Sequence, residues 1–265
     1  SNKTVPKSVE TWVGDNFESP WPERFPSEYF KKRLGLLKQR AYNRAYRGIA
    51  LSGDESWINP SAIEASKDRT LKVYDVLQNS EISRFTGIDL GHRPGEENSP
   101  TVIFTIGRTP TGKRIPLDIR KFQQKSILDT GRVILKVWEE LRPALIFCEN
   151  NGAQKYLIDL LQGLGTAGLP IEGYFTGAQK VDLETGVPSL LAEIETGQWI
   201  FPMGSGGDHE DGICRCNMCY WLNEIKHYPL LHADALMASW LSLEALRKIK
   251  ERGNRQGNFS IWHFG

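Results

Sequence analysis

A continuous apolar segment near the middle of the chain most restricts the folds that this sequence can adopt. Residues 144–148 read Ala-Leu-Ile-Phe-Cys without a polar position, and the run stops at Glu149. A strand that is apolar at every position is typically buried on both faces, as in the parallel part of an α/β sheet. Residues 153–164 have helical spacing, and the short segment 171–175 after them has the composition of a strand. Strand, helix and strand in this order predict a parallel crossover unit.

The segments before this unit predict strands at 84–91, 101–106 and 114–119, because each is short and rich in apolar and β-branched residues. Residues 107–113 match the first seven positions of a phosphate-binding P-loop. However, Arg114 replaces the Ser or Thr that would hold magnesium, and no helix follows. We interpret this segment as a hairpin turn and exclude an ATPase. Helical spacing or helix-start signals predict further helices at 124–141, 188–197, 221–225 and 231–252.

Three acids fall at comparable places in these predicted elements. Asp89 lies near the end of the first strand between apolar neighbours, Glu149 ends the fourth strand, and Asp234 lies in the first turn of the last helix. Asp89 alone could be a turn signal before glycine. If the first and fourth strands are neighbours, however, the two strand acids lie side by side and the helix brings the third across from them. Carboxylates this close are tolerated chiefly around divalent cations, and their hard oxygen ligands suit magnesium or manganese.

Three motifs resemble those of a known family, at residues 87–91 (Gly-Ile-Asp-Leu-Gly), 146–152 (Ile-Phe-Cys-Glu-Asn-Asn-Gly) and 232–238 (His-Ala-Asp-Ala-Leu-Met-Ala). They are similar to the nuclease domain of the large subunit of tailed-phage DNA-packaging terminases. The likeness extends to residues 194–202, and residues 25–60 resemble the region that joins the packaging ATPase to the nuclease. The resemblance implies an α/β fold of the ribonuclease H-like kind. Its mixed sheet would have strands 1–3 antiparallel and strands 4–5 parallel, and helices would flank it.

The resemblance implies that Asp89, Glu149 and Asp234 are the catalytic residues and the metal ligands. Two Mg²⁺ or Mn²⁺ ions held there could activate a water molecule and stabilise the leaving oxygen in phosphodiester hydrolysis. The sequence departs from the family at the third motif, where many members have two adjacent acids and this chain has Ala233 before Asp234.

Two further residues of the resemblance are expected to contact DNA. Lys180 is expected to hold a phosphate or neutralise the carboxylates, with a surface lysine as the alternative. His232 is expected to contact the scissile strand, with a simple hydrogen-bonded histidine near a helix start as the alternative. Asp118 could assist the site from the third strand, although a strand-end cap or a salt bridge is the favoured interpretation.

A cysteine-rich insert at about residues 204–220 needs a separate explanation. Its soft or borderline ligands are His209, Cys214, Cys216 and Cys219. In a chain of this length the cluster does not resemble a disulfide framework, and it suits a structural zinc ion. Free thiols are the alternative, and His227 is an alternative fourth ligand. Cys148, inside the apolar strand, is expected to serve packing alone.

The division of the chain follows from these motifs. We predict a lead-in or linker at residues 1–80, from an ATPase domain upstream in the same full-length chain, and a ribonuclease H-like nuclease domain at residues 81–265. Residues 1–80 are rich in proline, tryptophan and charge. With 33 basic and 32 acidic residues the formal net charge is +1, so a nucleic-acid surface must be local. No long apolar run or signal peptide is evident, and we expect no membrane association.

The predicted function is that of a metal-dependent endonuclease that cleaves double-stranded phage DNA concatemers when packaging starts and ends. The resemblance implies the portal and the small terminase subunit as partners and the cytoplasm of the infected bacterium as the location. Two alternatives stay open. One is another ribonuclease H-like nuclease, such as a Holliday-junction resolvase, and the other is a non-catalytic module that docks DNA or the portal.

Overall fold

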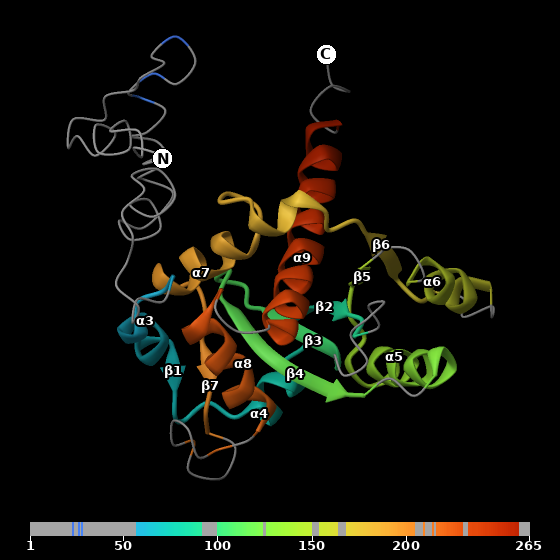
Figure 1. Cartoon of the computed structure of the whole chain (residues 1–265), viewed down its shortest axis with the longest axis horizontal. Helices are drawn as coiled ribbons and strands as arrows, with labels where there is room; N and C mark the ends of the chain where they lie inside the picture. The colour runs from blue at the N-terminus through green and yellow to red at the C-terminus, as the bar shows by residue number, and fades with distance from the viewer. Residues whose placement is uncertain are drawn as a thin grey trace, which may run out of the picture.

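The computed structural model contains a five-stranded mixed sheet with helices on both faces (Figure 1). It describes residues 57–91, 100–123, 126–149, 154–163, 168–204, 216–229 and 233–259, and the single positions 23, 26, 28, 209 and 214. The strand order is β4-β3-β2-β5-β6. The strands are β2 (Ser83–Asp89), β3 (Thr101–Arg108), β4 (Arg114–Phe122), β5 (Leu145–Glu149) and β6 (Ile171–Tyr174).

The strand directions confirm the predicted fold class. β2, β3 and β4 pair antiparallel, whereas β5 runs parallel to both β2 and β6. The apolar run that ends at Glu149 is therefore an interior parallel strand, and all five of its residues are buried. Burial on both faces explains why the four residues before Glu149 are all apolar.

Helices cover each face of the sheet. On one face lie α5 (Ile127–Leu141) and α6 (Gln154–Gly163), and on the other lie α7 (Val187–Glu195), α8 (Asn217–His227) and α9 (Asp234–Phe259). Successive residues of a strand point to opposite faces. Ile88 accordingly packs with α5 and α6, whereas Phe85 packs with α7, α8 and α9. Helix α8 has 11 residues, more than the five predicted, because an insert without apolar periodicity hides its first turn.

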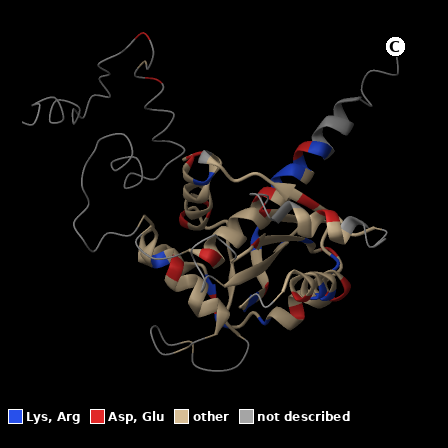
Figure 2. Cartoon of the chain, turned by 45° about the vertical axis from the view of Figure 1, so that its right-hand side comes forward, with Lys and Arg blue, Asp and Glu red and all other residues tan. Residues whose placement is uncertain are grey.

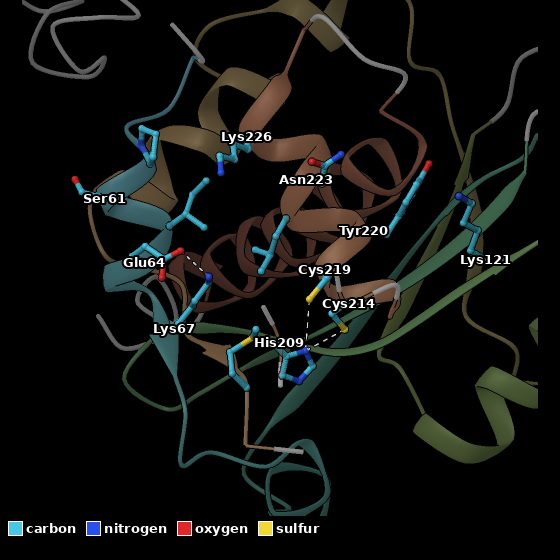
Figure 3. Close-up of a pocket in the computed structure, with 14 residues that line it drawn as sticks. Ser61, Glu64, Lys67, Lys121, His209, Cys214, Cys219, Tyr220, Asn223 and Lys226 are labelled. Carbon is cyan, nitrogen blue, oxygen red and sulfur yellow. Dashed lines mark hydrogen bonds and ion pairs between the residues drawn. The ribbon is translucent and has the colours of Figure 1, made fainter. Parts of the chain in front are cut away.

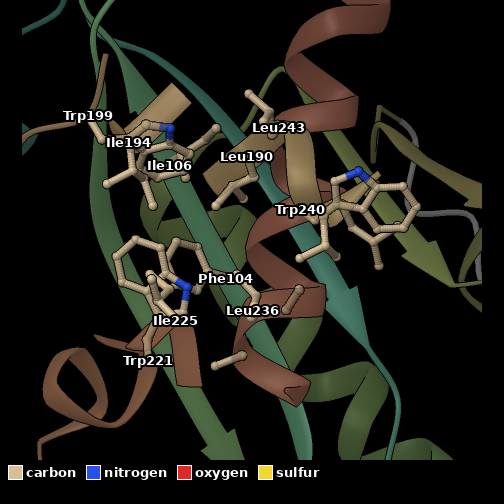
Figure 4. Close-up of a cluster of buried hydrophobic side chains, with 14 of the residues drawn as sticks. Phe104, Ile106, Leu190, Ile194, Trp199, Trp221, Ile225, Leu236, Trp240 and Leu243 are labelled. Atoms are coloured by element: carbon tan, nitrogen blue, oxygen red, sulfur yellow. The ribbon is translucent and has the colours of Figure 1, made fainter. Parts of the chain in front are cut away.

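The core between α8, α9 and the sheet is built around Trp221 (Figure 4). Its ring centroid lies 4.9 Å from that of Phe104 on β3 and 5.3 Å from that of Phe201. The indole nitrogen, which would be costly to bury without a partner, donates to the Ser239 hydroxyl of α9 at 3.0 Å. This one side chain therefore fixes α8 against both the sheet and α9.

Helix α9 lies on β2 without an intervening side chain at Gly87. A Cβ atom at this position would lie 2.1 Å from the Ala238 carbonyl oxygen and 2.4 Å from the Ser242 amide nitrogen. Only glycine permits this contact between a strand and a helix backbone. The electrostatic interaction between Asp234 and Asp89 shows that the helix start lies toward the end of β2, so α9 runs antiparallel to this strand.

Residues 57–80, which fall in the predicted lead-in, pack on the same body. They form α3 (Pro60–Ala65), β1 (Lys67–Asp68) and α4 (Val73–Gln78), and β1 pairs in parallel with β7 (Phe201–Pro202). Ile58 and Ile63 belong to the core under α7, α8 and α9. The boundary at residue 80 stays a prediction, and most of residues 1–56 lie outside the described part of the chain.

The segment that resembled a P-loop is a hairpin turn between β3 and β4. The Thr109 amide donates to the Lys113 carbonyl at 2.9 Å, and Gly112 has a φ of 86°. That backbone conformation favours glycine and closes the turn. No nucleotide-binding helix follows, because β4 begins at Arg114.

Candidate functional site

Two strand-end carboxylates lie next to each other on the sheet. In the parallel pair β2–β5, Ile88 is opposite Cys148, so Asp89 and Glu149 follow at the same edge. Their exposed fractions are 3% and 2%. Alternation along both strands places them on the face that α9 covers, as it does Gly87 two residues before Asp89.

The third predicted acid, Asp234, is the first residue of α9 and is 9% exposed. A carboxylate in the first turn of a helix interacts favourably with the helix dipole, which helps to explain its burial. The structure thus places the buried Asp89 and Glu149 side by side, and the buried Asp234 at the start of α9 is near enough to act electrostatically on Asp89.

The electrostatics of the three acids show an excess of negative charge. Burial raises the pKa of Asp89 well above its ordinary value, and the charges of Glu149 and Asp234 raise it further. Burial would also raise the pKa of Glu149, but hydrogen bonds with Asp89, Lys180 and Thr176 lower it. Lys180 acts in the opposite direction and lowers the pKa of both Asp89 and Glu149.

Lys180 lies beside the acids, in the short 3₁₀ helix η2 (Ala178–Val181) that follows β6. Its Nζ is 2.6 Å from Glu149 Oε1, and the buried Thr176 hydroxyl donates to the same oxygen at 2.5 Å. Lys180 thus partly neutralises the site, whereas its contact with DNA stays a prediction. Thr176 was not identified from the sequence, since a threonine in a loop carries no distinguishing signal.

The fourth buried carboxylate, Glu224 of α8, was also missed. It is 2% exposed, and its Oε2 accepts a hydrogen bond from the Leu236 amide at 2.8 Å. That amide belongs to the first turn of α9, where backbone N–H groups have no partner within the helix. Glu224 therefore caps the helix that begins with Asp234. Its position between Leu222 and Ile225, both buried, was the available signal in the sequence.

Two other residues predicted from the sequence have different outcomes. Asp118 accepts from Arg120 at 2.6 Å in a salt bridge, as favoured from the sequence. His232 lies outside the described residues, and its contact with DNA stays a prediction.

A second candidate site is the cysteine-rich insert. The Nδ1 of His209 lies 3.7, 3.5 and 3.4 Å from the Sγ atoms of Cys214, Cys216 and Cys219, respectively. All four ligand atoms lie within 4.8 Å of one another, so this group could hold a metal ion.

The two remaining candidates from the sequence do not take part in this group. His227 lies at the other end of α8, with its Nδ1 2.9 Å from the Asn223 carbonyl oxygen. Cys148 is fully buried in β5 and packs in the core beneath α5 and α6. The structure thus selects His209 over His227 as the histidine of the group.

Charge on the described surface is mixed, as the near-neutral composition predicts. Figure 2 shows Lys and Arg interspersed with Asp and Glu over the helices. On α9, for example, Lys248 and Arg252 both pair with Glu172 of β6. Contacts with a polyanion would therefore depend on local groups of side chains.

Comparison with known proteins identifies the fold. No family model and no curated protein matches the sequence. Among solved structures, the human cytomegalovirus terminase nuclease domain has a TM-score of 0.52 at 13% identity, over 71% of this chain and 94% of that one. The large terminase nuclease of the thermophilic phage G20c, crystallised with bound zinc, has a TM-score of 0.46 at 14% identity, over 63% and 82% of the two chains. The yeast mitochondrial Holliday junction resolvase has a TM-score of 0.39 at 13% identity, over 64% and 81%.

The first of these comparisons shows that the chain has the ribonuclease H-like fold of a terminase nuclease domain. At 13% identity the likeness concerns the fold. Any chemistry must be argued from the side chains of this chain.

Proposed function

We propose that this chain is the nuclease domain of the large subunit of a tailed-phage DNA-packaging terminase. In this proposal it is a metal-dependent endonuclease that cuts double-stranded DNA concatemers when packaging starts and ends. The observation that carries the proposal is the burial of Asp89, Glu149 and Asp234 on one face of a ribonuclease H-like sheet. Buried acids whose mutual repulsion raises the pKa of Asp89 are costly for the free protein, and a binding site for divalent metal explains them.

The residues present fit magnesium or manganese. All three donors are carboxylates, the hard oxygen ligands that these ions prefer. Asp89, Glu149 and Asp234 would hold two ions, which when bound would supply a nucleophilic water and stabilise the leaving oxygen of a phosphodiester. Beyond the metal ligands, the chain would contribute to this reaction through the groups that hold the carboxylates in place.

Three features position these carboxylates. The Thr176 hydroxyl and the Lys180 ammonium donate to one oxygen of Glu149 and so orient its carboxylate. Glu224 holds the first turn of α9, which carries Asp234. Pre-organised ligands of this kind lose little freedom when substrate binds.

The proposed partners follow from the proposed terminase function. The substrate is double-stranded DNA, bound with low sequence specificity through its phosphates, with Lys180 and His232 among the contacts. The ATPase domain of the full-length chain, the portal and the small terminase subunit complete the proposed assembly, in the cytoplasm of the infected bacterium. No described helix combines the length and apolarity needed to cross a membrane.

Plasmid cleavage tests the proposal. With Mn²⁺, the wild-type chain is expected to nick and linearise supercoiled plasmid, and Asp89→Asn is expected to abolish this activity while retaining the fold. Asp129→Asn is the matched control, because Asp129 is a partly exposed acid in the first turn of α5, on the opposite face of the sheet. It should cleave as the wild type does.

Other outcomes would contradict the proposal in distinct ways. Cleavage that survives Asp89→Asn would exclude the assigned acid site. Preference for a four-way junction over linear duplex would favour a resolvase. Duplex binding without metal-dependent cleavage would favour a docking module.

A further inference from the structure

We infer that His209, Cys214, Cys216 and Cys219 form a structural zinc site that fixes the start of α8. This inference is independent of the proposed nuclease activity, because it rests on a different set of residues. Figure 3 shows the labelled members His209, Cys214 and Cys219 turned toward one another beside a cavity of about 700 Å³.

The spacing of the ligand atoms agrees with a tetrahedral zinc ion. Zinc–sulfur bonds of about 2.3 Å and zinc–nitrogen bonds of about 2.0–2.1 Å place nitrogen and sulfur ligands about 3.5 Å apart in a tetrahedron. The observed distances from His209 Nδ1 to the three sulfur atoms are 3.4, 3.5 and 3.7 Å. One histidine and three cysteines are also a recognised ligand set of structural zinc.

Hydrogen bonding alone does not explain this arrangement. The Nδ1 atom of a neutral imidazole either donates one proton or accepts one, so it can satisfy one thiol well and not three. The cysteines are free rather than joined in a disulfide. A single cation at the centre accounts for the convergence of all four ligand atoms.

Groups of positive polarity lie around the ligand atoms. Cys216 is the N-cap of α8, and its sulfur accepts from the Cys219 amide at 3.4 Å. The positive end of the helix dipole therefore acts on this sulfur. Lys67, Lys121 and Lys226 also line the neighbouring cavity, where Lys67 is paired with Glu64 at 2.6 Å.

The position of the site indicates a structural role. Four protein ligands close the coordination shell, which leaves no position for a reacting water. None of the three acids of the first site lines the adjoining cavity. Cys216 and Cys219 instead fix the first turn of α8, whose Trp221 enters the core and whose Glu224 caps α9.

Zinc analysis of the purified chain, expressed without added metal or chelator, tests the inference. We expect one equivalent of zinc in the wild type and less than a tenth of an equivalent in Cys216→Ser and Cys219→Ser. Cys148→Ala is the matched control, because it removes a cysteine that is buried elsewhere, and it should retain one equivalent. Asp89→Asn should also retain one equivalent, which separates this site from the acidic site.

Cobalt reconstitution covers the case in which the serine variants do not fold. Wild-type chain refolded with Co²⁺ should show thiolate-to-cobalt charge-transfer absorption and the visible bands of a tetrahedral ion. Less than a tenth of an equivalent of zinc in the wild type, together with the absence of these bands, would overturn the inference. So would full zinc retention in a folded Cys216→Ser variant, or loss of zinc from Asp89→Asn.

Discussion

Replacing Gly87 by alanine should separate α9 from the sheet at the point where both position the acid site. The new Cβ would lie 2.1 Å from the Ala238 carbonyl oxygen, so the helix backbone would have to withdraw by about 0.9 Å to restore a contact of 3.0 Å. Overpacking in cores where side chains can adjust costs about 1–3 kcal/mol. Here the clashing atoms belong to the backbone of α9, which cannot rotate away as a side chain can. We therefore expect the free energy of unfolding to fall by about 3 kcal/mol or more.

Urea denaturation followed by tryptophan fluorescence measures this loss, and thermal melting should show a fall in Tm of roughly 6–12 °C. Gly131→Ala in α5 is the matched control, since its Cβ would meet Leu161 Cδ2 at an ordinary 3.4 Å. That variant should be unchanged or more stable by about 0.5–1 kcal/mol, because alanine favours the helix. A Gly87→Ala variant within 0.5 kcal/mol of the wild type would refute the close packing of α9 on β2.

Three further substitutions test the core, the helix cap and the charge balance of the site. Trp221→Ala should lower the free energy of unfolding by about 3–5 kcal/mol in urea titrations, and a loss below about 1 kcal/mol would contradict its central place in the core. Burial raises the pKa of Glu224 from 4.5 to about 7. The folded state therefore binds this proton more tightly than the unfolded state, and the contribution of Glu224 to metal-free stability should fall by about 3 kcal/mol as the pH rises from 4.5 to 7. Glu224→Gln should reduce this slope in urea titrations at pH 5 and 8, and an identical slope would contradict the assignment. Lys180→Met should tighten Mn²⁺ binding roughly three- to tenfold in calorimetry, because a competing positive charge beside Glu149 is lost while the Thr176 hydroxyl still orients the carboxylate. Unchanged or weaker binding would contradict that role.

The strands of the sheet could be predicted because they depend on local patterns, as when the all-apolar residues 144–148 identified an interior parallel strand. The pairing of this strand with residues 84–91 was a condition in the sequence analysis, and the structure confirms it by placing Asp89 beside Glu149. The segment 57–80 was harder, since its two helices have six residues each and are too short to show helical periodicity.

The residues that support the acids could not be predicted, because their roles arise from tertiary contacts. Glu224 reads as a surface acid within a helical pattern, and it gains its role only because α9 begins beside it. Thr176 becomes part of the site only when β6 lies next to β5. For the insert, the sequence offered both His209 and His227, and the positions of the side chains decided between them.

The central claim is that Asp89, Glu149 and Asp234 together bind divalent metal. Anomalous diffraction from crystals soaked in Mn²⁺ tests it most directly. We predict manganese peaks between these three carboxylates in the wild type, and their loss in Asp89→Asn crystals soaked in the same way. Well-ordered carboxylates without a manganese peak between them, at an Mn²⁺ concentration at which the wild type cleaves DNA in solution, would contradict the claim.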